Sequence, residues 1–233
     1  ERRMRDIERM REAAIHVMVS MAEFRDEATG NHVKRTQEYV RALGGVLSAR
    51  AGAIDPLDAL QVELIARAAP LHDIGKVAIP DGVLLKPGAL TAQELVVMKT
   101  HAVLGWEMLR RARERMGAED SPLIGYAMEI ARHHHERWDG TGYPDQLKGA
   151  AIPIAARLMA VADVYDALIS RRPYKAPIPH ATAVAMVSAG AGKQFDPAVI
   201  DAFIAIEDRF ANIARQWAAD PAAGDEPQPD RMH

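Results

Sequence analysis

Apolar residues recur three and four positions apart along almost the whole chain after Phe24. The pattern is strongest in the stretches HVKRTQEYVRALGGVLSA, PLIGYAMEIARHHHE and IPIAARLMAVADVYDALIS. Residues at this spacing lie on one face of a helix, whereas a half-buried strand needs alternation at every second residue, which no stretch shows convincingly. The sequence therefore predicts an all-α fold, with at most a minor hairpin over 76–90 or in the turn that follows the histidines.

Local signals mark several helix ends. Asp55 and Pro56 are expected to form the cap and first turn of the next helix. Thr91 and Glu94 have the spacing of a capping box. Gly75 is expected to end the helix before it. Longer helical patterns cover residues 91–115 and 196–219.

Residues 1–25 carry a heptad pattern, and its seam consists of Ile7, Met10, Ala14, Val17, Met21 and Phe24. The pattern predicts a stalk helix that pairs two copies in a homodimer or joins an upstream module; an ordinary first helix packed on its own core is the alternative. The chain opens without methionine inside a charged helical pattern, so an upstream sensory or receiver domain is expected. The main domain is expected over 26–215, and a flexible tail rich in proline and acidic residues over 216–233.

Composition excludes several classes of function. The net charge of the 233 residues is only -3, with acidic and basic residues interspersed, so no duplex nucleic acid is expected as a partner. The absence of cysteine excludes disulfides, thiolate metal sites and cysteine nucleophiles. No apolar run approaches the roughly 18 residues of a membrane span, and no signal peptide opens the chain. The sequence therefore predicts a cytoplasmic protein.

Histidine and aspartate residues at helices or helix ends are the candidate metal ligands. They are His32, His72, Asp73, His101, His134, His135 and Asp163. Imidazole and carboxylate without sulfur suit iron, manganese, zinc or nickel. Two ions roughly 3.5–4 Å apart would polarise a phosphoryl oxygen and generate a hydroxide nucleophile. The alternative is that each histidine is a hydrogen-bonded core residue and that the run of three is a polar helix end.

Three motifs resemble the HD-GYP family, a branch of the HD superfamily of metal-dependent phosphohydrolases. They are LHDIGKVAIPDGVLLKPGALTAQELVVMKTHAVLGWEML, HHERWDGTGYP and AARLMAVADVYDAL, in the order of the family. The resemblance covers about residues 25–203. It implies an HD-superfamily helical bundle that holds two or three ions, commonly iron or manganese, and hydrolyses the bacterial messenger cyclic di-GMP to pGpG or on to GMP.

The resemblance also implies roles for the candidate ligands. Asp73 would bridge two ions and take part in catalysis. One ion would be completed by His72, Asp163 and His32, and the other by His101, His134 and His135. His133 falls one position too early in the motif and is interpreted as a structural neighbour of the site rather than a ligand.

Four further residues are candidates for contact with substrate. Lys76 could stabilise charge on the scissile phosphate, or close its helix as a surface lysine. Tyr143, in the Gly142–Pro144 turn, would shape the site and contact a diguanylate cyclase, or belong to a purely structural turn. Arg172 and Lys175 match substrate-contacting positions of the family and suit phosphate and guanine, although a charged cluster after a helix is often only a solvated end.

One position departs from the family pattern. Family members with three ions have a glutamate four residues before the first histidine, where this chain has Ala28. Glu27 would point about 100° aside on a helix. The sequence therefore predicts two ions. A smaller metal cluster would favour a reaction that stops at pGpG, with slow further cleavage to GMP as the alternative. The alternatives are hydrolysis of another nucleotide, or a module that senses the dinucleotide or binds a protein without catalysis.

Overall fold

The structure is a computed structural model, and it describes residues 31–50, 57–118, 120–170 and 176–218. The α-helices are α2 (His32–Ser48), α3 (Ala59–Ala68), α4 (Asp81–Leu84), α5 (Ala92–Lys99), α6 (His101–Arg115), α7 (Pro122–His133), α8 (Ile154–Ile169), α9 (His180–Ser188), α10 (Pro197–Ala205) and α11 (Glu207–Gln216). Three 3-10 helices are η1 (Ala69–Leu71), η2 (Ile74–Ala78) and η3 (Gly149–Ala151). The prediction of an all-α fold is confirmed.

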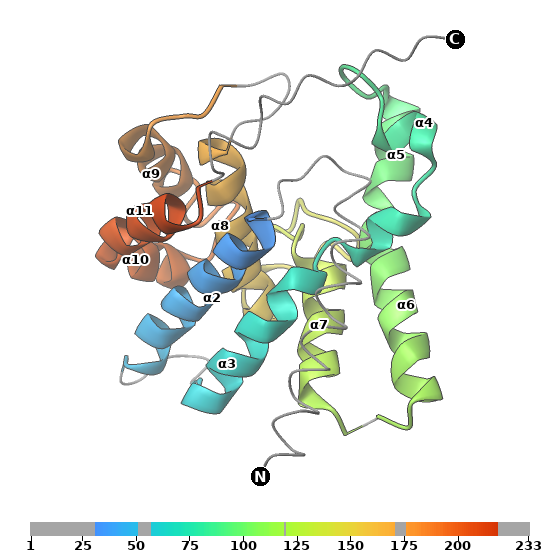
Figure 1. The fold of residues 1–233 in the computed structure, drawn as a ribbon, viewed down its shortest axis with the longest axis horizontal. Helices are drawn as coiled ribbons and strands as arrows, with labels where there is room; N and C mark the ends of the chain where they lie inside the picture. Colours follow the sequence, from blue (N-terminus) through green and yellow to red (C-terminus); the bar gives the residue numbers. More distant parts are fainter. Residues whose placement is uncertain (1–30, 51–56, 119, 171–175, 219–233) are drawn as a thin grey trace, which may run out of the picture.

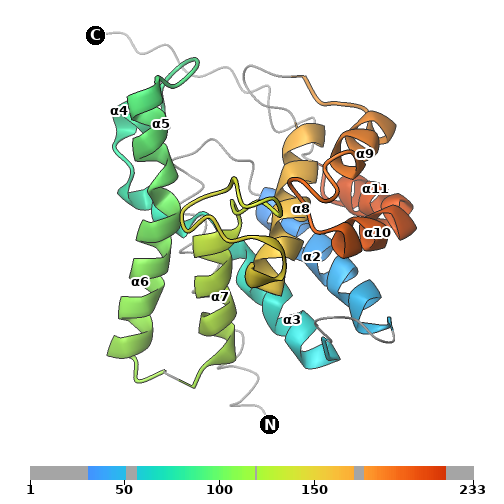
Figure 2. The same ribbon diagram turned by 180° about the vertical axis from the view of Figure 1, so that it is seen from behind.

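The helices form a bundle in which α2, α3, α7 and α8 pack side by side. Helices α9, α10 and α11 lie along one edge, and α4, α5 and α6 lie along the opposite edge (Figures 1 and 2). Helix α6 packs on α7 and on η2, so it connects the outer edge to the centre. Within the described residues, no helix is long and apolar enough to span a bilayer.

The core explains why α8 lies at the centre of the bundle. Nearly every side chain from Ala155 to Ala162 is buried. An aromatic cluster formed by Tyr39, Tyr165, Phe203 and Phe210, all fully buried, joins α8 to α2, α10 and α11. Burial of each such side chain stabilises the fold by about 1.5–3 kcal/mol. This packing fixes the positions of α2 and α8, which carry two of the candidate ligands.

Several local predictions can now be compared with the structure. The capping box of Thr91 and Glu94 is confirmed. Asp55 and Pro56 lie outside the described residues; α3 begins at Ala59, with Asp58 as its cap. The prediction of a minor hairpin was wrong, because residues 76–90 contain the end of η2 and all of α4. The described residues contain only an isolated bridge, between Ala191 and Phe195.

The two longer helical patterns are each divided. The first breaks at Thr100, whose hydroxyl donates to the carbonyl oxygen of Val97, and the second at Ile206, which leaves the helical conformation with a φ of -130°. The heptad segment 1–25 and residues 219–233 of the predicted tail lie outside the described residues.

Candidate metal centre

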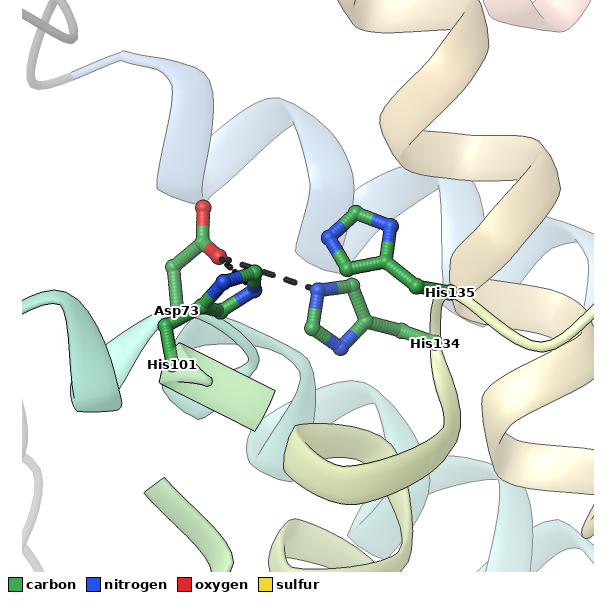
Figure 3. A group of neighbouring side chains, drawn as sticks. All are labelled: Asp73, His101, His134 and His135. Atoms are coloured by element: carbon green, nitrogen blue, oxygen red, sulfur yellow. Dashed lines mark ion pairs between the residues drawn. The ribbon is translucent and has the colours of Figure 1, made fainter. Parts of the chain in front are cut away.

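All seven predicted metal ligands meet in two neighbouring groups of side chains. The first group contains Asp73, His101, His134 and His135. The second group contains His32, His72 and Asp163. Within each group, one potential ligand atom from every residue lies within 4.8 Å of those of the others. In Figure 3 the side chains of the first group point toward one another.

The ligands are concentrated at helix ends. His32 and His101 are the first residues of α2 and α6, and His134 and His135 directly follow α7. Because His72 and Asp73 lie between two 3-10 helices rather than inside an α-helix, two adjacent side chains can reach one centre. Asp163 alone comes from the middle of a helix, α8.

A close glycine contact brings Asp73 and His101 together. Gly75 lies inside η2, and a Cβ atom there would be 2.0 Å from the carbonyl oxygen of His101 and 2.5 Å from the amide nitrogen of Gly105. The expectation that Gly75 ends a helix was therefore wrong. Its role is to let the backbone of η2 touch α6, which any larger side chain would prevent.

Asp73 connects the two groups. Its Oδ1 lies 3.3 Å from Nε2 of His101 and 3.7 Å from Nε2 of His134, both in the first group. Its Oδ2 lies 3.2 Å from Nε2 of His72 in the second group. Since each oxygen faces a different group, this carboxylate has the geometry of a bridge between two ions.

Three of the histidines are oriented by backbone carbonyl groups that accept from Nδ1. The acceptors are Ala69 for His72 at 3.0 Å, Met98 for His101 at 2.7 Å and Ile130 for His134 at 2.9 Å. A neutral imidazole that donates from Nδ1 keeps a lone pair on Nε2. All three Nε2 atoms, together with Oδ1 of Asp73, are buried and have no hydrogen-bond partner. Buried polar atoms are normally paired, so this set fits bound cations well.

His32 is oriented by a residue that the sequence analysis missed. Its Nδ1 lies 2.7 Å from Oδ2 of Asp166, a fully buried carboxylate on α8. Arg35 donates to both oxygens of Asp166, at 2.6 and 2.9 Å. Burial opposes the charge on Asp166, but the hydrogen bonds from Arg35 and His32 keep its pKa below the usual value. The available signal was its position three residues after Asp163, on the same face of a helix.

The electrostatics favour the metal-binding protonation states of Asp73, His101 and His135 but oppose that of His72. Burial opposes ionisation of Asp73, yet Lys76 and His72 hold its pKa well below the usual range. Burial lowers the pKa of His101 to about 4 and also lowers that of His135. Burial alone would lower the pKa of His72, but the Asp73 carboxylate raises it to about 9, so metal binding there must release a proton.

Two of the four predicted substrate contacts, Lys76 and Tyr143, lie within the described residues. Nζ of Lys76 lies 2.8 Å from Oδ2 of Asp73, at the edge of the centre. The ring of Tyr143 stacks on that of His135, with centroids 4.8 Å apart. Arg172 and Lys175 lie outside the described residues, as do Glu27 and Ala28, on which the two-ion prediction depends.

A third group, of His133, Glu136 and Asp145, has the residue types of a metal site but different chemistry. Both oxygens of Asp145 accept from Arg132, at 2.6 and 2.8 Å. Glu136 accepts from the backbone amides of Asp145 and Leu147. These bonds already use the carboxylate oxygens, so Arg132 and Asp145 fasten the turn after the histidines to α7. The structural role of His133 stays a prediction.

Comparison with known proteins agrees with this geometry. Residues 16–199 match the HD domain family. A probable cyclic di-GMP phosphodiesterase of Vibrio cholerae is 50% identical over 95% of this chain and 50% of its own length. A 3'3'-cGAMP-specific phosphodiesterase of the same organism is 37% identical over 90% of this chain and 37% of its own length. This chain thus spans about half the length, or less, of these relatives.

The solved structure of a cyclic GMP-AMP-specific phosphodiesterase from Vibrio cholerae has the same fold. It aligns with a TM-score of 0.57 and 18% identity, over 90% of this chain and 54% of its own. With the family match over most of the domain and the motifs that converge on the metal centre, the chain belongs to the HD-domain family and, within it, to the HD-GYP group.

Proposed function

We propose that this chain is a metal-dependent phosphodiesterase that hydrolyses cyclic di-GMP to pGpG. The observation that carries the proposal is the junction of two ligand groups by the single carboxylate of Asp73. The family membership and the relatives named as cyclic di-GMP phosphodiesterases support the substrate. A cytoplasmic location belongs to the same proposal.

Two divalent ions would be held, one by each group, with Asp73 shared between them. Iron or manganese suits these ligands best, with nickel and zinc as alternatives. Bound there, the ions would polarise the phosphodiester and supply a hydroxide nucleophile at neutral pH. The protein's own contribution is to orient the imidazoles through Nδ1 and to keep Asp73 ionised.

Lys76 and Tyr143 would act on the substrate at the edge of the centre. Lys76 places a positive charge beside Asp73, where negative charge develops on the phosphoryl oxygens during in-line attack. Burial raises the pKa of Tyr143, so its hydroxyl remains a hydrogen-bond donor at neutral pH. Arg172 and Lys175 are proposed to bind the phosphate and guanine groups of the same substrate.

A second candidate substrate is 3'3'-cGAMP, because a relative 37% identical to this chain is named for it. The two dinucleotides differ in one base, whereas the metal centre acts on the phosphodiester that they share. A homodimer through residues 1–25 and a cyclase contact through the turn at Tyr143 remain predictions.

The test is turnover after anaerobic loading with iron or manganese, using cyclic di-GMP, 3'3'-cGAMP and pGpG in parallel. Asp73→Ala should lose turnover and bound metal, because it removes the bridge between the groups. Asp201→Ala, which removes an exposed carboxylate on α10, is the matched control and should keep both. A fully loaded Asp73→Ala variant with wild-type turnover would refute the proposal.

A further inference from the structure

Lys99 stands at the outer end of a stack of side chains that begins in the metal centre. The ring of His101 contacts that of His135, with centroids 5.0 Å apart. His135 in turn stacks on Tyr143. Nζ of Lys99 lies over the Tyr143 ring, 5.0 Å from its centroid. The lysine is thus connected to the first group, through His135, by the ring of Tyr143.

The charge of Lys99 is not used within the described part of the chain. Lys76 pairs with Asp73 and Lys86 with Glu94, at 2.8 and 2.6 Å. Lys99 is exposed, forms no ion pair with a described carboxylate, and has its Nζ over the Tyr143 ring. A cation over a tyrosine at an exposed site contributes little to stability. The contact instead favours side-chain conformations that place Nζ beside the Tyr143 ring, which lowers the entropic cost of binding an anion there.

The backbone fixes this position as firmly as it fixes the ligands. Lys99 is the last residue of α5, and His101, two residues later, is the first residue of α6. Thr100 between them is held by bonds from both its amide and its hydroxyl to the carbonyl oxygen of Val97. The backbone of the lysine is therefore held close to a candidate metal ligand.

We propose that Lys99 binds the second, non-scissile phosphate of a cyclic dinucleotide. The inference rests on the proposed function: one phosphodiester of such a substrate lies at the metal centre, and the other belongs to the same small ring and must lie nearby. Lys76 serves the end of the site at Asp73, and Lys99 serves the end at Tyr143. An ammonium group forms charge-assisted hydrogen bonds with phosphate oxygens. Lys99 thereby favours substrates with two phosphates over simple diesters.

The experiment compares two substrates on metal-loaded protein: cyclic di-GMP, with two phosphates, and bis(p-nitrophenyl) phosphate, with one. Lys99→Met should lower kcat/KM for cyclic di-GMP by about 10-fold to 100-fold, mainly through KM, and leave the single diester unaffected. Lys99→Arg, which keeps the positive charge, should retain most of the wild-type kcat/KM for cyclic di-GMP. Arg111→Met is the control, because it removes a cation whose side chain is 65% exposed and lies about 15 Å along α6 from His101. It should leave kcat/KM unchanged for both substrates.

Each other outcome refutes the inference. Equal losses for both substrates would show that Lys99 acts only by supporting Tyr143 and His135. Unchanged kinetics for both would show that the lysine does not contact substrate. Wild-type protein that carries metal and cleaves the single diester but neither binds nor cleaves cyclic di-GMP would refute the proposed function itself, and this inference with it.

Discussion

Asp166→Asn tests the hydrogen bonds that support the metal centre without changing any of the seven candidate ligands. Asp166 accepts from Nδ1 of His32, from two nitrogens of Arg35 and from the hydroxyl of Ser170. An asparagine of the same shape has one oxygen and one NH2 group, so it must present a donor to either Arg35 or His32. The substitution therefore leaves a buried guanidinium without its counter-ion, and it leaves His32 without its acceptor whenever the amide turns its NH2 group toward Nδ1.

The magnitudes follow from burial. Arg35 is only 5% exposed and Asp166 is fully buried. Removal of one partner of a buried pair costs about 3–5 kcal/mol, which for a domain of this size lowers the melting temperature by about 10 °C or more. Loss of the residue that orients a metal-binding histidine weakens metal affinity by about 10-fold to 100-fold.

Calorimetry of the metal-free protein and metal titration measure the two effects separately. The double variant Arg35→Met with Asp166→Leu is the control, because replacing both charges with apolar side chains is often neutral for stability. It should recover the melting temperature but not the affinity, since His32 still lacks its acceptor. If Asp166→Asn melts and binds metal like the wild type, the reasoning about this network is wrong.

Four other substitutions test the centre and its surroundings. Gly75→Ala should lower both the melting temperature and metal occupancy, because its Cβ would lie 2.0 Å from a backbone oxygen of α6; an unchanged metal count would contradict this. Metal analysis should show loss from His134→Ala and retention in His133→Ala, and equal loss would refute the structural role of His133. Arg132 holds the pKa of Asp145 below its usual value, so this pair stabilises the fold fully above the unfolded pKa of about 3.9 and loses its effect as pH falls through the lower folded pKa. Thermal melts from pH 6 to 2 should therefore decline less steeply for Asp145→Asn, and an identical decline would exclude the pair as a contributor.

The candidate ligands could be selected from sequence because six of the seven lie in the three short motifs, and the structure brings all seven into two groups. The same holds for the capping box at Thr91, whose partner Glu94 is three residues away. The partner of His32, by contrast, lies 134 residues further along the chain. The position of Asp166 three residues after Asp163 was a local signal, but it does not identify so distant a partner, and Asp166 was missed.

Packing also decides features that propensity cannot. Gly75 looked like a helix end because glycine often ends helices, but in the structure it permits contact between η2 and α6. Helical spacing continues through Thr100 and Ile206, yet α5 ends at Lys99 and α10 ends at Ala205. Periodicity gives the type of element more reliably than its bounds.

The most direct test of the central claim is to count the metal ions in the wild-type chain after anaerobic reconstitution and to identify its products from cyclic di-GMP by chromatography. The account predicts two ions per chain and accumulation of pGpG. A chain that binds no metal, or that carries metal and leaves cyclic di-GMP intact, would contradict it.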